Sequence, residues 1–342
     1  MSHYNLVLIG FGNVGQSLAH LLLSKEEELR TRYQITCSVT GIATGSHGIS
    51  FNPDGIDLQA ALELASKGDS IEKLSAQPPP INSLDLIRSC NADVLFENSP
   101  VNYKTGQPAI DHLSTALKLG MHAITANKGP VVHAFRQLTE LAQAQGRRFY
   151  FESTVMDGAP IFSLFREALP GAKLKSLRGI LNSTTNLILT RMEKGESLEQ
   201  SIRYAQSIGV AETDPSGDVD GWDAAIKVSA LATVLMDVPL KPSDVDRMGI
   251  RSISSDDITN AKIQGKRWKL VCSAERIGER VYARVAPEMV LADSPLYYVE
   301  GTTSTIQFET DVLGLLSITE ANPGPDTTAY GLFADFLNAV KS

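Results

Sequence analysis

A glycine-rich turn directly follows the first apolar run of the chain. Residues 4–9 (YNLVLI) form a β-prone segment, and Gly10, Gly12 and Gly15 come next with the spacing GxGxxG. In such a turn the first glycine allows a tight bend, and the second leaves room for a pyrophosphate beside the backbone. The third lets the following helix pack close to the strand. Because apolar residues recur at helical spacing through residues 14–30, we interpret this segment as a dinucleotide-binding strand–turn–helix rather than an ordinary strand turn.

Short apolar runs alternate with helix-like segments through the first half of the chain. The expected strands are residues 34–43, 93–96, 122–125 and 149–152, and the expected helices are residues 58–66, 83–90, 109–119 and 131–145. This alternation predicts a mostly parallel, doubly wound sheet. Ligands of such sheets bind outside the carboxyl ends of the strands. The candidate ligand-binding loops are therefore the segments that follow strands, at residues 97–100, 126–130 and 153–160.

The pattern changes after Pro160 and predicts a second domain of the α+β class. The expected elements are helices at 161–168, 187–194, 198–208 and 222–236, a polar turn at 182–186, an acidic loop at 212–220, and antiparallel strands at 177–181, 267–274, 281–285 and 305–309. A final helix at 327–340 is expected to return to the first domain. We therefore assign residues 1–152, completed by about 322–342, to a nucleotide-binding domain, and residues 153–321 to a second domain.

Charge and composition exclude several classes of protein. The formal net charge is −8 over 342 residues, and no lysine- or arginine-rich run offers a surface for nucleic acid. No apolar stretch approaches the roughly 18 residues that span a bilayer. The N-terminus enters a strand almost at once, so we expect no signal peptide. The three cysteines are far apart and odd in number, which predicts reduced thiols in a cytoplasmic protein rather than disulfides or a zinc site.

The densest set of chemical groups lies in residues 211–227 (AETDPSGDVDGWDAAIK), where five carboxylates fall within twelve residues. Crowded carboxylates are costly unless they face solvent or a cation. Asp223 and Lys227 stand four residues apart on an otherwise apolar helix, hence on one face. One interpretation is a solvated acidic loop with a surface ion pair. The other is a site in which the lysine exchanges a proton with a substrate oxygen while the carboxylates bind a substrate ammonium.

A second lysine, Lys128, follows a short apolar strand in the sequence TANKGP at 125–130. A lysine at the carboxyl end of a strand is either a loop residue in water or an active-site cation. The local sequence leaves both interpretations open.

Taken together, these segments resemble the homoserine dehydrogenases. The resemblance rests on GFGNVG at 10–15, ENSP at 97–100, TANKGP at 125–130, ESTVMDGAPI at 152–161, GILNSTTNLIL at 179–189 and GVAETDPSGDVDGWDAAIK at 209–227, in this order. It implies a Rossmann-type doubly wound sheet with an α+β catalytic and dimerisation domain, and a homodimer. It also implies NAD(P)-dependent, reversible reduction of L-aspartate 4-semialdehyde to L-homoserine, a step in the biosynthesis of threonine, methionine and isoleucine.

The resemblance also implies roles for individual residues. Cofactor contacts fall to Gly10, Gly12, Asn13, Val14, Gly15, Ser99, Pro100 and Lys128, with Ser99 and Pro100 near the nicotinamide. Lys227 and Asp223 are implied in proton transfer and substrate binding, and Glu212 and Asp218 in holding the amino group or ordering the site. Lys128 is implied beside substrate and cofactor, and we expect it to meet Lys227 over the bound nicotinamide. Main-chain carbonyls near Glu152, Val155, Asp157 and Ala159 match a site for a monovalent cation such as sodium.

The chain departs from the family pattern in three places. Residues 156–158 are Met-Asp-Gly where a glycine-rich run is usual, and residues 322–326 (NPGPD) replace a Gly-Ala-Gly turn. Because the chain ends at residue 342, we expect a monofunctional enzyme without a C-terminal regulatory domain and without feedback inhibition by threonine.

The sequence leaves an alternative open both for the choice of cofactor and for the function. An acid at the end of the second strand is typical of NAD sites, whereas residues 43–48 (ATGSHG) hold no carboxylate, which favours NADP with NAD as the alternative. A semialdehyde dehydrogenase acting on another amino-acid aldehyde would need a nucleophilic cysteine, and no cysteine stands in a recognisable nucleophile context. A catalytically silent NADP-binding regulatory protein would have no reason to keep Lys128, Asp223 and Lys227.

Overall fold

The computed structural model describes residues 1–341, which divide into two compact units. Unit 1 contains residues 1–160 and the chain from Gly324 onward, and unit 2 contains residues 161–323. Segment 153–160, which the sequence pattern placed in the second domain, lies in unit 1, where Ser153 donates a hydrogen bond to the carbonyl of Thr328 at 2.7 Å. No helix within residues 1–341 is long and apolar enough to cross a membrane.

Unit 1 is built on a six-stranded sheet that confirms the predicted doubly wound architecture. Its strands are β1 (Ser2–Ile9), β2 (Ile35–Ala43), β3 (Ile49–Phe51), β4 (Val94–Glu97), β5 (His122–Thr125) and β6 (Phe149–Tyr150). The spatial order is β3-β2-β1-β4-β5-β6, and every pairing is parallel except that of β3 with β2. The carboxyl ends of β1, β4 and β5 therefore meet at one edge, where the candidate loops begin.

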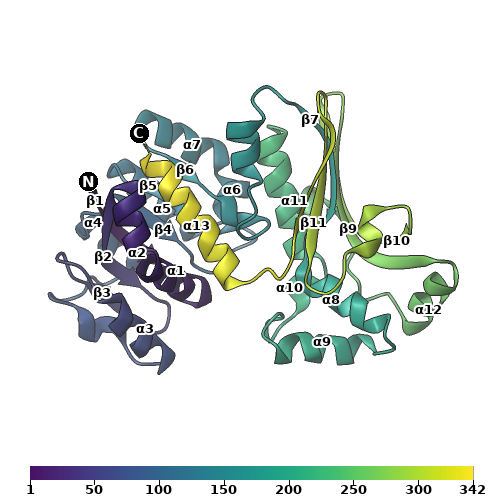
Figure 1. Cartoon of the computed structure of the whole chain (residues 1–342), viewed down its shortest axis with the longest axis horizontal. Coiled ribbons are helices and arrows are strands. Elements are labelled where there is room, and N and C mark those ends of the chain that lie inside the picture. The colour runs from purple at the N-terminus through teal and green to yellow at the C-terminus, as the bar shows by residue number, and fades with distance from the viewer. Residues whose placement is uncertain (342) are drawn as a thin grey trace. The chain divides into compact units, whose positions relative to one another are not determined.

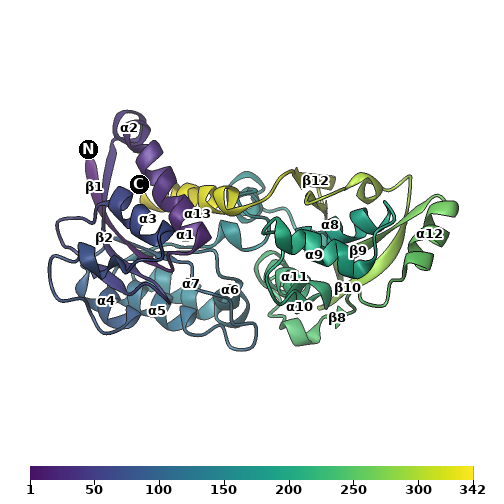
Figure 2. The same cartoon turned by 90° about the horizontal axis from the view of Figure 1, so that it is seen from below.

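Helices cover both faces of this sheet (Figure 2). They are α1 (Asn13–Ser24), α2 (Glu26–Glu28), α3 (Leu58–Ser66), α4 (Ser83–Ser89), α5 (Ala109–Lys118), α6 (Lys128–His133), α7 (Phe135–Ala144) and α13 (Pro325–Val340), with a short 3₁₀ turn η2 (Ile71–Leu74). The single helix expected over 131–145 is wrong, because the backbone of Ala134 leaves the helical region (φ −142°) and separates α6 from α7.

The C-terminal helix α13 returns to unit 1, where Figure 1 shows it in yellow among the elements of the N-terminal half. The fully buried Phe336 on α13 packs edge-on against Tyr4 and Phe96, with ring centroids 6.0 and 6.2 Å apart. Ser17 of α1 donates a hydrogen bond to Asp326 at 2.7 Å. The last helix is thus part of the apolar core beside β1 and β4, which confirms that prediction.

Unit 2 holds a second six-stranded sheet of order β12-β11-β7-β9-β10-β8. Its strands are β7 (Leu174–Ile180), β8 (Asp246–Arg247), β9 (Lys266–Ile277), β10 (Arg280–Leu291), β11 (Ser304–Thr310) and β12 (Gly314–Glu320). All pairings are antiparallel except the short one between β8 and β10. The sequence pattern did not indicate β12, because this edge strand is mostly exposed and lacks a buried face.

The helices of unit 2 are α8 (Ser183–Met192), α9 (Leu198–Ser207), α10 (Ser216–Val219), α11 (Trp222–Leu235) and α12 (Ser255–Ile263). Helices α8 and α11 pack on the sheet (Figure 1). The polar turn expected at 182–186 is wrong: Asn182 caps α8, and residues 183–186 form its first turn. Residues 164–168 form a π-helical turn (Leu164–Ala168) within the helix expected at 161–168.

Candidate active site

The glycine turn of unit 1 leaves one open place beside the backbone. Gly10 has φ +96°, and a Cβ added there would lie 2.5 Å from the carbonyl oxygen of Asn98. A Cβ on Gly15 would overlap the carbonyl of Gly10, whereas one on Gly12 would meet nothing within 4 Å. Gly12 is also the N-cap of α1, with no side-chain cap and no acidic residue in the first turn. The backbone at Asn13 and Val14 thus presents a positive helix end to an open space, which fits a pyrophosphate.

A buried carboxylate that the motifs did not point to organises the neighbouring loop. Glu97 ends β4 and is fully buried. It accepts a hydrogen bond from the hydroxyl of Ser99, and Thr125 donates to its main-chain carbonyl at 2.8 Å. The ring nitrogen Nδ1 of His112 lies 3.3 Å from the same carboxylate. A buried carboxylate needs such partners, so Glu97 fixes the position of Ser99.

Asn127 then ties this loop to the one that carries Lys128. Its amide nitrogen donates to the carbonyls of Ser99 at 3.0 Å and Pro100 at 3.4 Å, and its amide oxygen accepts from the N–H of Gly129 at 3.0 Å. Asn127 therefore caps α6, and Lys128 is the half-buried first residue of that helix. The structure thus brings Ser99, Pro100 and Lys128 into adjoining loops at the carboxyl edge of the first sheet.

In unit 2 the acidic cluster forms around one asparagine. The side-chain nitrogen of Asn182 donates to Asp218 at 2.6 Å and to Asp223 at 3.0 Å, while its oxygen caps α8 by accepting from the N–H of Thr185 at 2.8 Å. Asn182 is buried. The amide oxygen of Asn182 caps α8 and its amide nitrogen binds both carboxylates, so the position of the start of α8 is coupled to the positions of Asp218 and Asp223.

Lys227 completes the cluster from the next turn of α11. Its Nζ lies 3.4 Å from Asp223 Oδ2 and donates to the carbonyl of Leu181 at 2.7 Å. The side chains of Asp223 and Lys227 are only 14 and 15% exposed. Gly221, with φ +80°, separates α10 from α11 and lets Asp218 and Asp223 approach the same amide. The cluster therefore excludes the interpretation of a solvated surface pair.

The surroundings of Asp218 change the pKa of its carboxyl group. Removal from water and the negative charge of Asp223 raise the pKa of Asp218 above its ordinary value. Hydrogen bonds from Asn182 and Thr184 and the charge of Lys227 act in the opposite direction. A carboxylate whose pKa is raised by burial and by a neighbouring carboxylate gains from any added cation, which is typical of a binding site for an ammonium group.

Glu212 does not join this cluster in the structure. It is exposed in the loop before α10, and its carbonyl accepts a hydrogen bond from Gln206 at 3.1 Å. Asp220, in the same acidic segment, pairs instead with Arg251. Of the five carboxylates in residues 211–227, Asp218 and Asp223 are therefore the two that accept hydrogen bonds from Asn182, the N-cap of α8.

The segment that the family resemblance links to a cation lies entirely in unit 1. The N–H of the buried Glu152 donates to Asp335 Oδ2 at 2.8 Å, and Asp157 adopts φ +40° while its carboxylate accepts from Thr327 at 3.0 Å. Among residues 1–341 no three His, Cys, Asp or Glu side chains are grouped to hold a metal ion. Any cation here would therefore depend on main-chain carbonyls, such as those of Val155 and Ala159.

The three cysteines are placed as inert thiols. Burial raises the pKa of Cys37 and Cys90 to about 11 and that of Cys272 to about 12. A thiol must ionise to attack an aldehyde carbon, so none of them suits the thioester chemistry of an aldehyde-oxidising dehydrogenase.

Both units match the same family of known proteins. The family model described as "Homoserine dehydrogenase" matches residues 160–337, and the one described as "Homoserine dehydrogenase, NAD binding domain" matches residues 10–152. The chain belongs to the homoserine dehydrogenase family. It is an oxidoreductase of that family, in agreement with the resemblance seen in its motifs.

Individual homoserine dehydrogenases match over nearly the whole chain. The NAD(+)-dependent homoserine dehydrogenase of Pseudomonas canavaninivorans is 33% identical, covering 100% of this chain and 97% of its own. The homoserine dehydrogenase of Methanocaldococcus jannaschii is 35% identical, covering 99% of each. A homoserine dehydrogenase structure from Thiobacillus denitrificans has a TM-score of 0.83 at 27% identity, covering 99% of this chain and 73% of that one.

Proposed function

We propose that the enzyme interconverts L-aspartate 4-semialdehyde and L-homoserine with a nicotinamide cofactor, and that Asp218, Asp223 and Lys227 form its substrate and proton-transfer centre. One observation carries this proposal: two half-buried carboxylates and one ammonium share a hydrogen-bonded cluster around Asn182. Both substrates carry an ammonium group, and both have an oxygen on C4 that gains or loses a proton. The cluster offers a group suited to each.

The substrate ammonium is assigned to the carboxylates of Asp218 and Asp223. The raised pKa of Asp218 arises from burial and from the charge of Asp223. An incoming ammonium relieves both causes, because it replaces water and neutralises the excess charge. Glu212 retains its sequence-based role in holding the amino group as a prediction.

The proton is assigned to Lys227. In the reducing direction its ammonium, directly or through an ordered water, donates a proton to the carbonyl oxygen as that oxygen becomes an alkoxide. The contact with Asp223 and the hydrogen bond to Leu181 keep this ammonium oriented. Lys128 stabilises the developing charge or anchors the substrate.

The cofactor, when bound, accepts or supplies the hydride. The open space at Gly12 and the uncapped N-terminus of α1 support a pyrophosphate there. The linked loops of Ser99 and Lys128 support a nicotinamide at the carboxyl edge of the sheet. These residues bind and orient; they carry no part of the redox chemistry.

NADP is proposed in preference to NAD. The turn after β2 offers hydroxyl and imidazole groups: Thr44 accepts from the N–H of His47 at 2.6 Å, and Ser46 Oγ lies 2.7 Å from His47 Nδ1. Such groups suit a 2′-phosphate. The carboxylate of Glu72, from η2, lies against Gly48 at the end of this turn and would oppose a phosphate. Comparison of kcat/KM for the two cofactors tests the preference, and a strong preference for NAD would overturn it.

Two further parts of the proposal have independent tests. A monovalent cation near Glu152, Val155, Asp157 and Ala159 predicts that sodium and potassium chloride at equal ionic strength support different activities; equal activity contradicts it.

A homodimer is supported by exposed apolar side chains on the strands of unit 2, among them Tyr282, Met289 and Leu315. Light scattering coupled to gel filtration measures it, and a monomer contradicts it.

The central test is homoserine-dependent reduction of the nicotinamide, followed at its absorbance band. Lys227→Met is expected to lower kcat by about 10²- to 10⁴-fold, with the Kd of the cofactor unchanged. The matched control is Lys73→Met. Lys73 forms an exposed i,i+4 pair with Asp69 at 3.2 Å, so its loss is expected to leave kcat unchanged. Near-normal turnover of Lys227→Met refutes the assigned role.

A further inference from the structure

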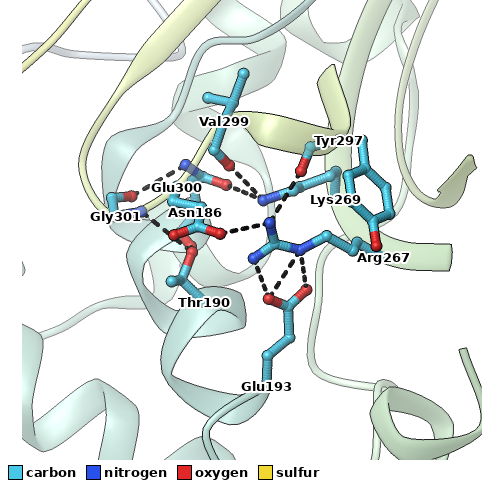
Figure 3. Close-up of polar contacts among 9 residues, drawn as sticks. All are labelled: Asn186, Thr190, Glu193, Arg267, Lys269, Tyr297, Val299, Glu300 and Gly301. Carbon is cyan, nitrogen blue, oxygen red and sulfur yellow. Dashed lines mark hydrogen bonds and ion pairs between the residues drawn. The ribbon is translucent and has the colours of Figure 1, made fainter. Parts of the chain in front are cut away.

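A lysine that the proposed mechanism does not use is completely buried in unit 2. Lys269, on β9, is 0% exposed. Within residues 1–341 it forms no ion pair; its Nζ donates to Asn186 Oδ1 at 3.1 Å and to the carbonyl of Val299 (Figure 3). Burial, and next the charge of Arg267, lower the pKa of Lys269 to about 8, while Glu193 and Glu300 act to raise it. Lysines are almost never fully buried without a compensating role.

The partner of Lys269 belongs to the helix that carries the substrate cluster. Asn186 lies on α8, and its side-chain nitrogen donates to the carbonyls of Gly301 at 3.0 Å and Thr303 at 3.2 Å. The hydroxyls of Ser183 and Ser304 lie 3.1 Å apart. Figure 3 shows Lys269 and Asn186 pointing toward each other beside the segment Val299–Gly301. The first turns of α8 are therefore fastened to residues 299–304 by polar contacts, with Lys269 joining helix and loop.

The same turn positions the carboxylates. Asn182, the N-cap of α8, stands one helical turn before Asn186 and donates to both Asp218 and Asp223. A small shift of the first turn of α8 moves this amide relative to the two carboxylates. Because the pKa of Asp218 depends on the hydrogen bond from Asn182, such a shift changes both the geometry and the protonation of the site.

We propose that Lys269 is a positioning residue for the substrate-ammonium site: through Asn186 it holds the start of α8 where Asn182 hydrogen-bonds Asp218 and Asp223. This inference rests on the proposed role of those carboxylates. It assigns to Lys269 no contact with substrate or cofactor.

A second buried cation on the same strand provides a matched control. Arg267, two residues before Lys269, pairs with Glu193 at 2.9 Å and with Glu300 at 2.6 Å, and donates to the carbonyl of Tyr297 at 3.0 Å. Glu193 is the C-cap of α8. Arg267 therefore anchors the C-terminal end of α8 and, like Lys269, the segment 297–300, so its loss tests the destabilisation of this region without removal of the hydrogen bond to Asn186.

The experiment compares Lys269→Met with Arg267→Met in the full-length enzyme. Lys269→Met is expected to raise the KM for homoserine by about tenfold, with the Kd of the cofactor unchanged. It also moves the acidic limb of kcat/KM to higher pH, because Asp218, which faces Asp223, Lys227 and Thr184, loses the hydrogen bond from Asn182. Arg267→Met lowers Tm but leaves the KM for homoserine and the pH profile as in the wild type.

Three outcomes overturn the inference. These are an unchanged KM and pH profile in Lys269→Met, an equal rise of KM in Arg267→Met, and, should Lys269→Met fail to fold, a wild-type KM in the milder variant Asn186→Ala. Asp218→Asn separates this inference from the proposed function. If Asp218→Asn leaves the KM for homoserine unchanged, the proposed function fails; if it raises KM while Lys269→Met does not, the positioning role alone fails.

Discussion

The two units build their candidate sites from different materials. In unit 1 the site is largely backbone: Gly10 and Gly15 have no room for a Cβ, Gly12 has room left over, and the start of α1 carries no side-chain cap. In unit 2 the site consists of side chains from three segments, gathered around Asn182. A backbone site can be recognised from the spacing of a few glycines. A side-chain site needs the tertiary fold to bring its members together.

The two candidate sites also differ in how their residues affect the stability of the fold. In unit 1 the groups that face the open space are neutral N–H groups at a helix end, which take water or a ligand as their acceptor. In unit 2 two carboxylates share one buried asparagine, and burial together with the charge of Asp223 raises the pKa of Asp218. We therefore expect substitutions in the first site to weaken binding at no gain in stability, and some substitutions in the second to stabilise the fold while impairing activity.

The largest effect on cofactor binding is expected at the glycine turn, where two alanine substitutions separate the roles of the glycines. Gly12→Ala has free space for its Cβ and is expected to raise the cofactor KM by about a hundredfold with Tm unchanged, since the methyl group occupies the place of the pyrophosphate. Gly15→Ala is expected to lower both affinity and Tm, because its Cβ meets the carbonyl of Gly10. Enzyme kinetics and thermal melts check this; equal Tm losses would remove the distinction.

A roughly tenfold effect is expected from Glu97→Gln. The amide retains the size of the side chain but replaces one acceptor oxygen with a donor, and the hydroxyl of Ser99 is the group that depends on the carboxylate as its acceptor. The cofactor KM rises as the Ser99 loop shifts. The KM for homoserine is the internal control, because the assigned substrate cluster lies in unit 2. A change confined to the homoserine KM would contradict the comparison.

Asp218→Asn is expected to stabilise the protein by about 1 kcal/mol near pH 7. The folded-state pKa of Asp218 is raised, so its ionised form costs stability, and this cost grows as pH rises above the ordinary carboxyl pKa of 3.8. The gain in Tm over the wild type, about 2–4 °C at pH 7, therefore shrinks as pH falls toward 4. A lower Tm for the variant at pH 7 would show that the carboxylate stabilises the fold.

The effect that is smallest at neutral pH concerns His122 of unit 1. Burial lowers its pKa from 6.5 to about 4, with Arg147 and Arg148 acting in the same direction. In the unfolded chain the imidazole of His122 is protonated below about pH 6.5, whereas in the folded chain it stays neutral down to about pH 4. The free energy of unfolding therefore falls as pH decreases through this range. His122→Gln is expected to flatten this dependence in denaturant titrations, whereas His20→Gln, at an exposed position of α1, retains it.

The sequence predicted those features that depend on local pattern. The glycine spacing predicted β1, the turn and α1, and the family motifs pointed to Asp218, Asp223 and Lys227. Other features depend on contacts distant in sequence. Nothing in ENSP distinguishes Glu97 as the buried carboxylate that orders the loop, since its partners His112 and Thr125 come from helix α5 and from the neighbouring strand β5.

The turn predicted at 182–186 was also wrong because local sequence alone could not decide its structure. Its hydroxyl- and amide-rich residues favour turns and helix N-termini alike, and the packing of α8 decides between them. Likewise Lys269, within an expected strand, gave no sign that its amine would be buried, because only the fold supplies the oxygens of Asn186 and Val299.

The three protonated thiols have a practical consequence. Maleimides and similar reagents attack the ionised sulfur, so Cys37, Cys90 and Cys272, whose pKa values burial has raised well above neutrality, will react slowly under mild conditions. A single cysteine introduced on the surface would then carry nearly all of an attached fluorophore or spin label. The native chain can therefore serve as its own background for spectroscopic reporters, without prior replacement of its sulfur-containing residues.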